Sequence, residues 1–180
     1  MEQLTPMMQQ YMETKNEYKD CILFYRLGDF YEMFFDDAIC AHKELELTLT
    51  GKSCGLKERA PMCGVPFHSA ETYINRLVER GYKVAICEQV EDPKLAKGLV
   101  KREVTRIVTP GTNCFTGSLD ETRNNYLMGI VSVDHSFGIS IVDVTTGEYM
   151  LTEVESVSKL LDEVNKFMPA EIICNDSFYI

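Results

Sequence analysis

No apolar run in this sequence reaches the roughly 18 residues that a helix needs to span a bilayer. The first ten residues, MEQLTPMMQQ, lack the basic segment and the apolar stretch of a secretory signal. Seven cysteines are present, an odd number, and none belongs to a C-x-x-C pair of the kind that zinc ribbons use. We therefore expect a cytoplasmic protein without a membrane partner, whose cysteines are reduced and mostly buried.

Patterns for nucleotide binding and for catalysis are scarce as well. The segment LTGKS at 49–53 lacks the first glycine of a phosphate-binding loop, because Glu46 occupies that position. The three histidines, His42, His68 and His135, lie far apart and have no cysteine or carboxylate at ligand spacing. The sequence thus predicts neither a nucleotide-hydrolysis site nor a histidine-based catalytic or metal site.

Positive charge is in short supply, and it is unevenly distributed. The net charge of −10 at first argues against nucleic acid as a partner. Residues 1–115, however, hold 15 Lys/Arg and 17 Asp/Glu, whereas residues 116–180 hold 3 Lys/Arg and 11 Asp/Glu. This asymmetry suggests two units with different partners, although two solvated surfaces of different charge are the simpler interpretation. The first part contains one basic stretch, which consists of Lys94, Lys97, Lys101, Arg102 and Arg106.

The N-terminal part of the chain predicts a helix followed by a hairpin. Residues 6–18 form an amphipathic pattern that starts at a threonine and a proline, both favourable at a helix start. Two runs rich in β-forming residues, 22–27 and 30–35, flank the pair Gly28-Asp29. Glycine supplies the positive φ that a two-residue turn requires, so this spacing predicts a β-hairpin.

The elements after the hairpin are those of a mixed α/β domain. Asp36 or Asp37 is expected to cap a helix that continues to Leu45. The segment 61–68 holds too much proline and glycine for a central strand. The other predicted elements are a strand over 45–50, a loop over 51–60, a helix from Ser69 to Gly81, and strands over 82–90 and 101–109.

A second α/β pattern follows a turn-rich linker over 110–125. Its residues are few for an independent core, so we expect the chain to stop before this second unit is complete. The predicted elements are strands over 126–134, 138–144 and 148–154, a helix over 156–168 and a strand over 171–174.

The run FYRLGDFYEMFFDD, residues 24–37, combines aromatic rings with carboxylates. Alternate residues of a strand share a face, so Phe30, Glu32 and Phe34 project together beside the hairpin turn. A ring and a carboxylate placed side by side can contact one ligand. The simpler interpretation makes Phe30 a core residue and Glu32 an edge charge. The sequence leaves open whether Phe34 is buried.

Two other functions remain open on the residues alone. Asp29, Asp36 and Asp37 allow a small nuclease in which carboxylates hold two metal ions about 4 Å apart. Ordinary local roles compete with this hypothesis, because Asp29 fits a turn and the other two fit a helix start. The third hypothesis is a protein-interaction fragment that uses the acidic residues 116–180 as its contact face.

Four collinear segments carry a family resemblance. They are TPMMQQY at 5–11, FYRLGDFYEMFFDDA at 24–38, PMCGVPFHSAETYINRLVERGYKVAICEQ at 61–89 and KGLVKREVTRIVTPGT at 97–112. Through them the chain resembles the N-terminal part of the MutS family of bacterial DNA mismatch repair proteins.

This resemblance implies a mixed-sheet α/β mismatch-recognition domain over 1–112 and a linker over 113–124. Residues 125–180 would begin a connector domain with a ribonuclease-H-like α/β fold, which is incomplete here. The lever, clamp and ATPase domains of the family have no counterpart in the sequence. We therefore expect a DNA-binding fragment that is not itself an enzyme.

The resemblance also implies a DNA-binding site. By motif match, Phe30 stacks on a mispaired or unpaired base from the minor groove and Glu32 forms a hydrogen bond to that base. Glu32 would accept from a ring N–H or, if protonated, donate to a ring nitrogen. The wedge would kink the duplex, which costs least where the pair is already defective. The residues expected to contact the DNA backbone or groove are Lys52, Met62, Pro66, His68, Lys97, Lys101 and Arg102.

The implied partners are double-stranded DNA with a mismatch or small insertion loop, a second copy of the parent protein, and a MutL-type protein. The implied location is the cytoplasm, at the nucleoid. No cofactor is expected in this sequence, whereas ATP and Mg²⁺ would serve the parent protein. The segment 51–60 departs from the commoner family pattern in length and charge.

Overall fold

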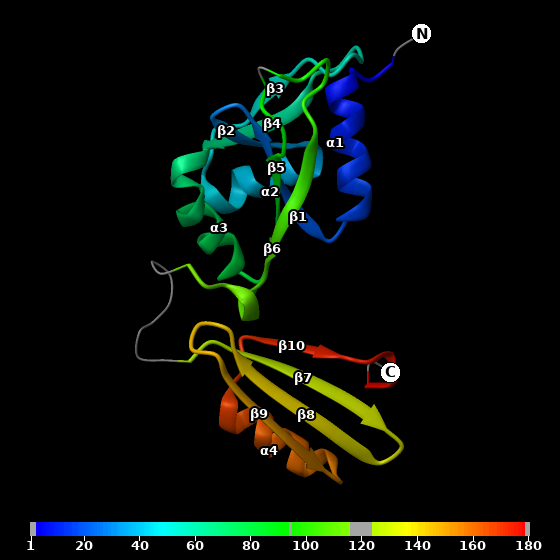
Figure 1. The fold of residues 1–180 in the computed structure, drawn as a ribbon, viewed down its shortest axis with the longest axis vertical. Helices are drawn as coiled ribbons and strands as arrows, with labels where there is room; N and C mark the ends of the chain where they lie inside the picture. The colour runs from blue at the N-terminus through cyan, green and yellow to red at the C-terminus, as the bar shows by residue number, and fades with distance from the viewer. Residues whose placement is uncertain (1–2, 94, 116–123, 179–180) are drawn as a thin grey trace. The chain divides into compact units, whose positions relative to one another are not determined.

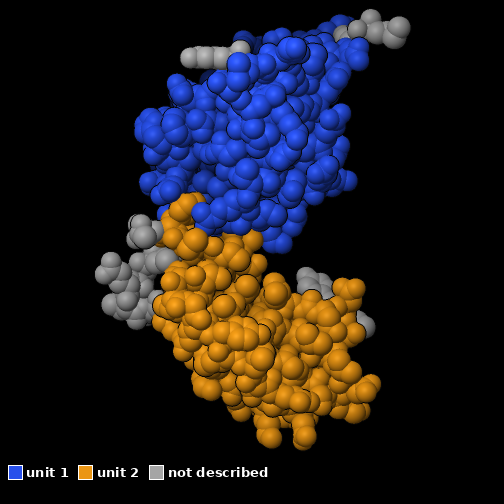
Figure 2. All heavy atoms as spheres, viewed as in Figure 1, with its two compact units in different colours: residues 1–108 blue, residues 109–180 orange. Residues whose placement is uncertain are grey.

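The structure is a computed structural model that describes residues 3–93, 95–115 and 124–178. The chain folds into two compact units, residues 1–108 (unit 1) and 109–180 (unit 2), which Figure 2 colours separately. Each unit combines helices with a mixed sheet, which confirms the predicted α/β class. Across the described ranges, no helix is both long enough and apolar enough to cross a membrane.

Unit 1 is built on a six-stranded sheet (Figure 1). The strand order is β3-β4-β2-β1-β5-β6. Strands β1 and β5 are parallel, and every other neighbouring pair is antiparallel. The strands are β1 (Cys21–Leu27), β2 (Phe30–Phe34), β3 (Thr50–Lys52), β4 (Ala60–Pro66), β5 (Lys83–Gln89) and β6 (Arg102–Val108).

Helices pack on both faces of this sheet, and α1 and α3 lie on opposite sides of it (Figure 1). Met8 and Tyr11 of α1 pack against the face that includes Leu23. The neighbouring Phe24 points to the other face and is fully buried as well. Strand β1 is therefore covered on both sides. The helices are α1 (Pro6–Glu17), α2 (Phe35–Leu45) and α3 (Ala70–Val78), and a 3₁₀ turn, η1 (Phe67–Ser69), precedes α3.

The β1–β2 hairpin forms as the sequence predicts. Gly28 takes a φ of 60°, in the left-handed region that side chains disfavour, and this permits the two-residue turn. The register pairs Leu27 with Phe30 and Tyr25 with Glu32. Paired residues share a face, so Phe30 and Glu32 lie on the face of β2 that looks toward α1.

The segment after α2 corrects one prediction. Residues 45–50 alternate like a strand, but Glu46 takes a φ of 59° and ends α2 in the left-handed conformation. Strand β3 begins only at Thr50 and ends at Lys52. The predicted strand over 45–50 is therefore wrong, and part of the predicted loop over 51–60 is strand.

Strand β4 corrects a second prediction, because the segment 61–68 was not expected to form a central strand. It pairs with both β2 and β3. Pro61 and Pro66 lie near the ends of the strand. Gly64 lies opposite Glu32, where a Cβ would meet the Tyr31 carbonyl oxygen at 3.2 Å. Proline and glycine are tolerated here because they occupy the ends of β4 and a point of close approach.

The start of α2 corrects a third prediction. Phe34 is the N-cap residue, so neither Asp36 nor Asp37 caps the helix. Phe35 takes a left-handed φ of 53°, which turns the chain from β2 into α2. The Asp37 carboxylate is instead engaged by Lys15.

Unit 2 holds a four-stranded sheet of order β10-β7-β8-β9, in which β10 and β7 are parallel. Its single described α-helix, α4, packs Leu160 onto Met128, Ile130, Ile139 and Ile141 of the sheet. The strands and the helix agree with the predicted ones. They are β7 (Tyr126–Val133), β8 (Ser136–Asp143), β9 (Glu148–Val154), α4 (Val157–Phe167) and β10 (Glu171–Cys174).

Local signals explain why these elements begin where they do. The Ser156 hydroxyl accepts a hydrogen bond from the Lys159 N–H and so caps α4, as predicted. Two 3₁₀ turns, η2 (Pro110–Thr112) and η3 (Asp176–Phe178), complete the described elements of the unit. Most of the predicted linker over 113–124 lies outside the described residues.

Candidate nucleic-acid interface

Several of the predicted site residues lie at one end of the strands of the unit 1 sheet. Strand β1 ends and β2 begins at the hairpin turn, beside Pro66 at the end of β4. Gln89 at the end of β5 and Arg102 at the start of β6 reach the same end. We call this region, formed by the turn together with Pro66, Gln89 and Arg102, the hairpin end of the sheet. The loop between β5 and β6, which contains Lys97, also leaves from the hairpin end.

Phe30 is exposed at the hairpin end, although the run around it is strongly apolar. Its side chain is 47% exposed, whereas Phe34 on the same face is 1% exposed. Phe24, Tyr25 and Tyr31 are also buried. Phe34, whose burial the sequence leaves open, is therefore buried. Of these five rings, only Phe30 is available to a partner.

Glu32 lies two residues along β2 and forms an ion pair with Lys52. The Lys52 Nζ lies 2.5 Å from the Glu32 Oε2, and it reaches across β4 from strand β3. The same ammonium lies 5.6 Å from the centre of the Phe34 ring. A positive group thus lies beside the carboxylate that was expected to approach DNA. No local pattern predicts this contact, because β3 and β2 are not consecutive in the chain.

The two β4 residues of the predicted site lie beside opposite ends of β2. Met62 pairs with Phe34, and Pro66 pairs with Phe30. His68 follows in η1 and is exposed, with its ring in edge contact with Phe67 at 5.9 Å. Phe67 is not among the residues predicted individually to contact DNA, although its exposed ring begins η1 directly after Pro66.

The predicted basic residues have different environments. Lys97 is exposed, and Lys101 is exposed with its ammonium 2.5 Å from Glu103. Arg102 is only half-buried, but its guanidinium donates to the Arg26 carbonyl at 2.7 Å and to the Gln10 side chain at 3.0 Å. Arg102 therefore ties α1 to the hairpin in this structure. Lys94 lies outside the described residues.

Two tyrosines near the hairpin end keep their protons. Burial, opposed by the nearby Arg102 guanidinium, raises the pKa of Tyr25 to about 12. Burial and a hydrogen bond to Glu88 raise the pKa of Tyr31 to about 12. At neutral pH both hydroxyls are donors, to Gln10 at 2.6 Å from Tyr25 and to the Glu88 carboxylate from Tyr31.

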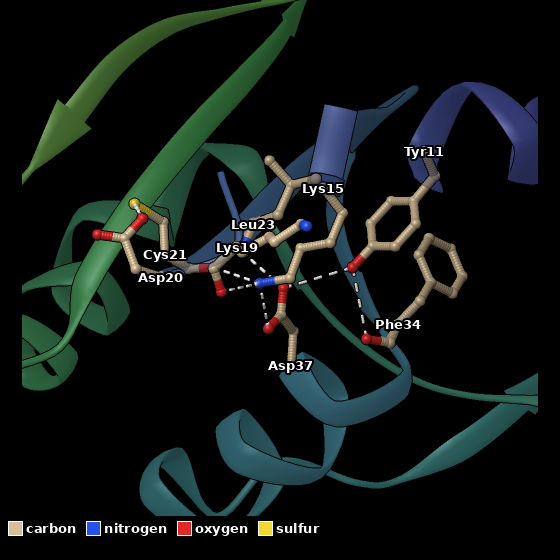
Figure 3. Close-up of polar contacts among 8 residues, drawn as sticks. All are labelled: Tyr11, Lys15, Lys19, Asp20, Cys21, Leu23, Phe34 and Asp37. Atoms are coloured by element: carbon tan, nitrogen blue, oxygen red, sulfur yellow. Dashed lines mark hydrogen bonds and ion pairs between the residues drawn. The ribbon is translucent and has the colours of Figure 1, made fainter. Parts of the chain in front are cut away.

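Asp37, a candidate metal ligand in the nuclease hypothesis, is part of a buried network instead. Figure 3 shows its carboxylate between Lys15 and Tyr11. It lies 2.9 Å from the Lys15 Nζ and accepts hydrogen bonds from the Leu23 N–H at 2.9 Å and the Tyr11 hydroxyl at 3.4 Å. Burial raises the pKa of Asp37, and the bonds from Leu23 and Lys15 oppose this shift. The network links α1, β1 and α2.

Within the described ranges, no three His, Cys, Asp or Glu side chains group closely enough to hold a metal ion. Asp29 lies in the hairpin turn, where its carbonyl oxygen accepts from the Phe67 N–H. Asp36 is exposed at the start of α2. Four of the cysteines, Cys21, Cys54, Cys63 and Cys87, are buried free thiols, as predicted.

Comparison with known proteins decides the family. The family model described as MutS domain I matches residues 5–115, and the model described as MutS domain II matches residues 125–179. The chain belongs to the MutS family. The exposed Phe30 and the paired Glu32 therefore lie within its MutS domain I, and the sheet covered by α4 lies within its MutS domain II.

Named MutS relatives agree with the family models. The DNA mismatch repair protein MutS of Lachnoclostridium phytofermentans is 72% identical over 179 residues, which are 99% of this chain and 19% of that protein. The DNA mismatch repair protein MutS of Acetivibrio thermocellus is 63% identical over 182 residues, 99% of this chain and 21% of that protein. The chain thus spans about a fifth of the length of these curated relatives.

Proposed function

We propose that unit 1 recognises mispaired or unpaired bases in double-stranded DNA, and that the parent protein acts in mismatch repair. The observation that carries this proposal is the exposure of Phe30 at the hairpin end, while Phe24, Tyr25, Tyr31 and Phe34 of the same hairpin are buried. An aromatic ring can wedge into a base step from the minor groove, and a step that is already defective costs least to open. Membership of the MutS family supports the choice of ligand.

Stacking by Phe30 explains a broad range of substrates. Every base has a π-face, so a ring that stacks accepts many different mispairs. The duplex kinks at the opened step, and a mismatch deforms more easily than a good pair. Discrimination in this proposal therefore comes largely from the cost of deforming the DNA.

Glu32 adds a directional contact next to the stacked base. A carboxylate is repelled by DNA phosphates, but here the Lys52 ammonium lies 2.5 Å from it and offsets that repulsion. A carboxylate paired with an ammonium is an acceptor, so we propose that Glu32 accepts a hydrogen bond from a ring N–H of the mispaired base. Lys52 then acts through Glu32, in addition to any contact with the DNA backbone.

The other predicted residues have supporting roles in this proposal. Pro66 and His68 would contact the groove from the hairpin end, whereas Met62 lies beside Phe34 at the other end of β2. Lys97, Lys101 and Arg102 attract the phosphates. Phosphate contacts fix position and carry no base information, so these residues tune affinity and its salt dependence.

The activities of the parent protein are proposed on the same family grounds. We propose that ATP and Mg²⁺ bind outside these 180 residues, since Gly51 and Lys52 of the Gly-Lys-Ser segment lie in strand β3 and Lys52 is paired with Glu32. A second copy of the parent and a MutL-type protein are the proposed protein partners.

The test compares Phe30→Ala with the unchanged protein in binding to a G·T duplex and to a matched duplex of the same sequence. Loss of one aromatic stack is expected to weaken G·T binding by about 5- to 100-fold, with little change for the matched duplex. Ile107→Ala is the matched control, because Ile107 is similarly exposed at 42% but lies near the far end of β6. Equal loss on both duplexes, or no loss, would contradict the wedge role of Phe30.

A further inference from the structure

The hairpin end carries a second exposed aromatic ring, Phe67. Its side chain is 42% exposed, close to the 47% of Phe30. Its N–H donates to the Asp29 carbonyl at 2.9 Å, which fixes η1 against the turn. Among the exposed large apolar side chains of the described part of unit 1, Phe30 and Phe67 are the two aromatic ones.

The Arg26 guanidinium stacks on one face of the Phe67 ring. The Arg26 guanidinium lies 3.8 Å from the centre of the Phe67 ring and 5.5 Å from that of Tyr31, within the range of cation–π attraction. Its Nε donates to the Gly28 carbonyl at 2.5 Å, and its Nη1 lies 3.5 Å from the Glu88 carboxylate. These contacts hold the guanidinium in place on several sides, and the Glu88 carboxylate already forms an ion pair with it.

The two exposed rings lie on opposite faces of the hairpin. The register pairs Leu27 with Phe30 on one face, and Arg26 with Tyr31 on the other. Because Phe67 stacks on Arg26, its ring belongs to the second face. An exposed apolar ring thus lies on each face of the hairpin beside the turn. The planar Arg26 guanidinium covers one face of the Phe67 ring.

We propose that Phe67 is a second aromatic side chain in contact with the DNA, which packs on the sugar or base edge of a nucleotide beside the step that Phe30 opens. This inference rests on the proposed function of Phe30. A wedge that kinks DNA opens the minor groove and exposes apolar sugar and base surface next to the kink. A preset apolar ring covers that surface without first having to be ordered. Arg26 is a positioning residue that acts through Phe67.

The test measures binding of Phe67→Ala, Phe67→Tyr and Arg26→Lys variants to the G·T and matched duplexes, each variant made in the complete protein and titrated at several salt concentrations. Phe67→Ala is expected to weaken G·T binding by about 5- to 20-fold, the effect of losing one ring contact. Its salt dependence should not change, because no charge is removed. Phe67→Tyr keeps the ring and is expected to bind like the unchanged protein, which also shows that the site folds.

Arg26→Lys separates positioning from phosphate binding. Lysine keeps the positive charge but loses the planar face that covers Phe67. We expect a smaller loss than for Phe67→Ala and an unchanged salt slope. Full G·T affinity in Arg26→Lys would overturn the positioning role, because the charge alone would then be sufficient.

The Phe30 and Phe67 variants fail in distinguishable ways. If Phe30→Ala loses G·T binding and Phe67→Ala does not, the role of Phe67 is overturned while the proposed function stands. If neither variant loses binding, both are overturned. Ile107→Ala serves again as the control for truncating an exposed apolar side chain.

Discussion

The sheets of the two units differ in how completely they are covered. In unit 1, strand β1 buries five consecutive residues, Cys21 to Tyr25, so both of its faces are packed. In unit 2, α4 covers one face, on which Met128 and Ile130 are buried. The other face leaves Val131 and Leu151 exposed and contains a hollow of about 620 Å³ lined by Gly129, Gly138, Ser140, Leu151 and Ile173, among others.

Because of this difference, an exposed apolar residue is stronger evidence for a binding site in unit 1 than in unit 2. A single exposed side chain on a protein surface needs no explanation, whereas an exposed ring in a run that is otherwise buried does. Phe30 is such an exception in unit 1. On the open face of unit 2, exposed apolar residues are common, so no one of them singles out a site. We therefore base the function on unit 1.

The buried carboxylates of the two units differ as well. In unit 1, burial raises the pKa of Asp37 more than its partners lower it. In unit 2, burial by itself would raise the pKa of Asp143, but hydrogen bonds from Thr145 and from the Asn125 N–H together hold it below the ordinary value. The two pKa values thus move in opposite directions, because burial outweighs the partners of Asp37 whereas the hydrogen bonds outweigh burial at Asp143.

The largest expected effect is on β1, the strand of unit 1 that is packed on both faces. Leu23 is 0% exposed in β1, so Leu23→Ala should leave a cavity and lower the stability of unit 1 by about 3 kcal/mol. Native-state hydrogen exchange resolves the two units and measures this loss from the amides of β1 and β5. Similar loss of protection in β7 and β8 would show that the two sheets do not differ in the way proposed.

A somewhat smaller loss is expected from Asp37→Ala. The substitution leaves the Leu23 N–H without its acceptor and the Tyr11 hydroxyl with the Phe34 carbonyl alone. The stability of unit 1 should fall by about 2 kcal/mol. Asp36→Ala is the matched control, because the neighbouring Asp36 is exposed, and it should change stability by less than about 0.5 kcal/mol. Urea unfolding, monitored through the hydrogen exchange of unit 1 amides, measures the stability change of each variant. Equal effects would show that the network around Asp37 is not structural.

The two buried acids should give opposite pH dependences. The folded pKa of Asp143 lies below the ordinary 3.8, so its stabilisation is complete above pH 3.8 and is lost as the pH falls through the folded pKa. The folded pKa of Asp37 lies above 3.8, so its ionised form costs stability that is regained as the pH falls toward 3.8. Asp143→Asn and Asp37→Asn should each remove the corresponding slope in unit-resolved hydrogen exchange. Unchanged slopes in both variants would contradict the assignment.

The smallest effect is expected on the open face of unit 2. Leu151 is 69% exposed, so Leu151→Ser should change stability by less than about 0.5 kcal/mol. Thermal unfolding of unit 2 measures it. A loss of more than about 1 kcal/mol would mean that Leu151 is packed in solution, and the contrast between the two sheets would then be weaker than described.

Local signals predicted much of the fold. The β1–β2 hairpin and the strands of unit 2 follow from alternation and from turn residues such as Gly28, whose φ fits the turn that it marks. The errors arose where tertiary contacts overrode local preference. Glu46 ends α2 in the left-handed conformation although residues 45–50 alternate, and β4 tolerates Pro61 and Pro66 because both lie near its ends. Asp37 resembles a cap in sequence but meets Lys15 in space.

The candidate site was partly predictable for the same reason. Placing Phe30 and Glu32 on one face needs only the period of two in a strand. The Lys52–Glu32 pair and the Arg26–Phe67 stack each join residues 20 or more positions apart in the chain, so no local pattern indicates them. The roles of all these residues in DNA binding stay predictions.

If Glu32 contacts a base as proposed, its ion pair with Lys52 links that contact to the shortest strand of unit 1. Strand β3 has three residues and lies at the edge of the sheet, where backbone pairing opens most readily. Each opening of β3 would carry Lys52 away from Glu32 while the core around Leu23 stays closed. The charge next to the mispaired base would then fluctuate on the timescale of edge-strand opening, which is faster than that of global unfolding.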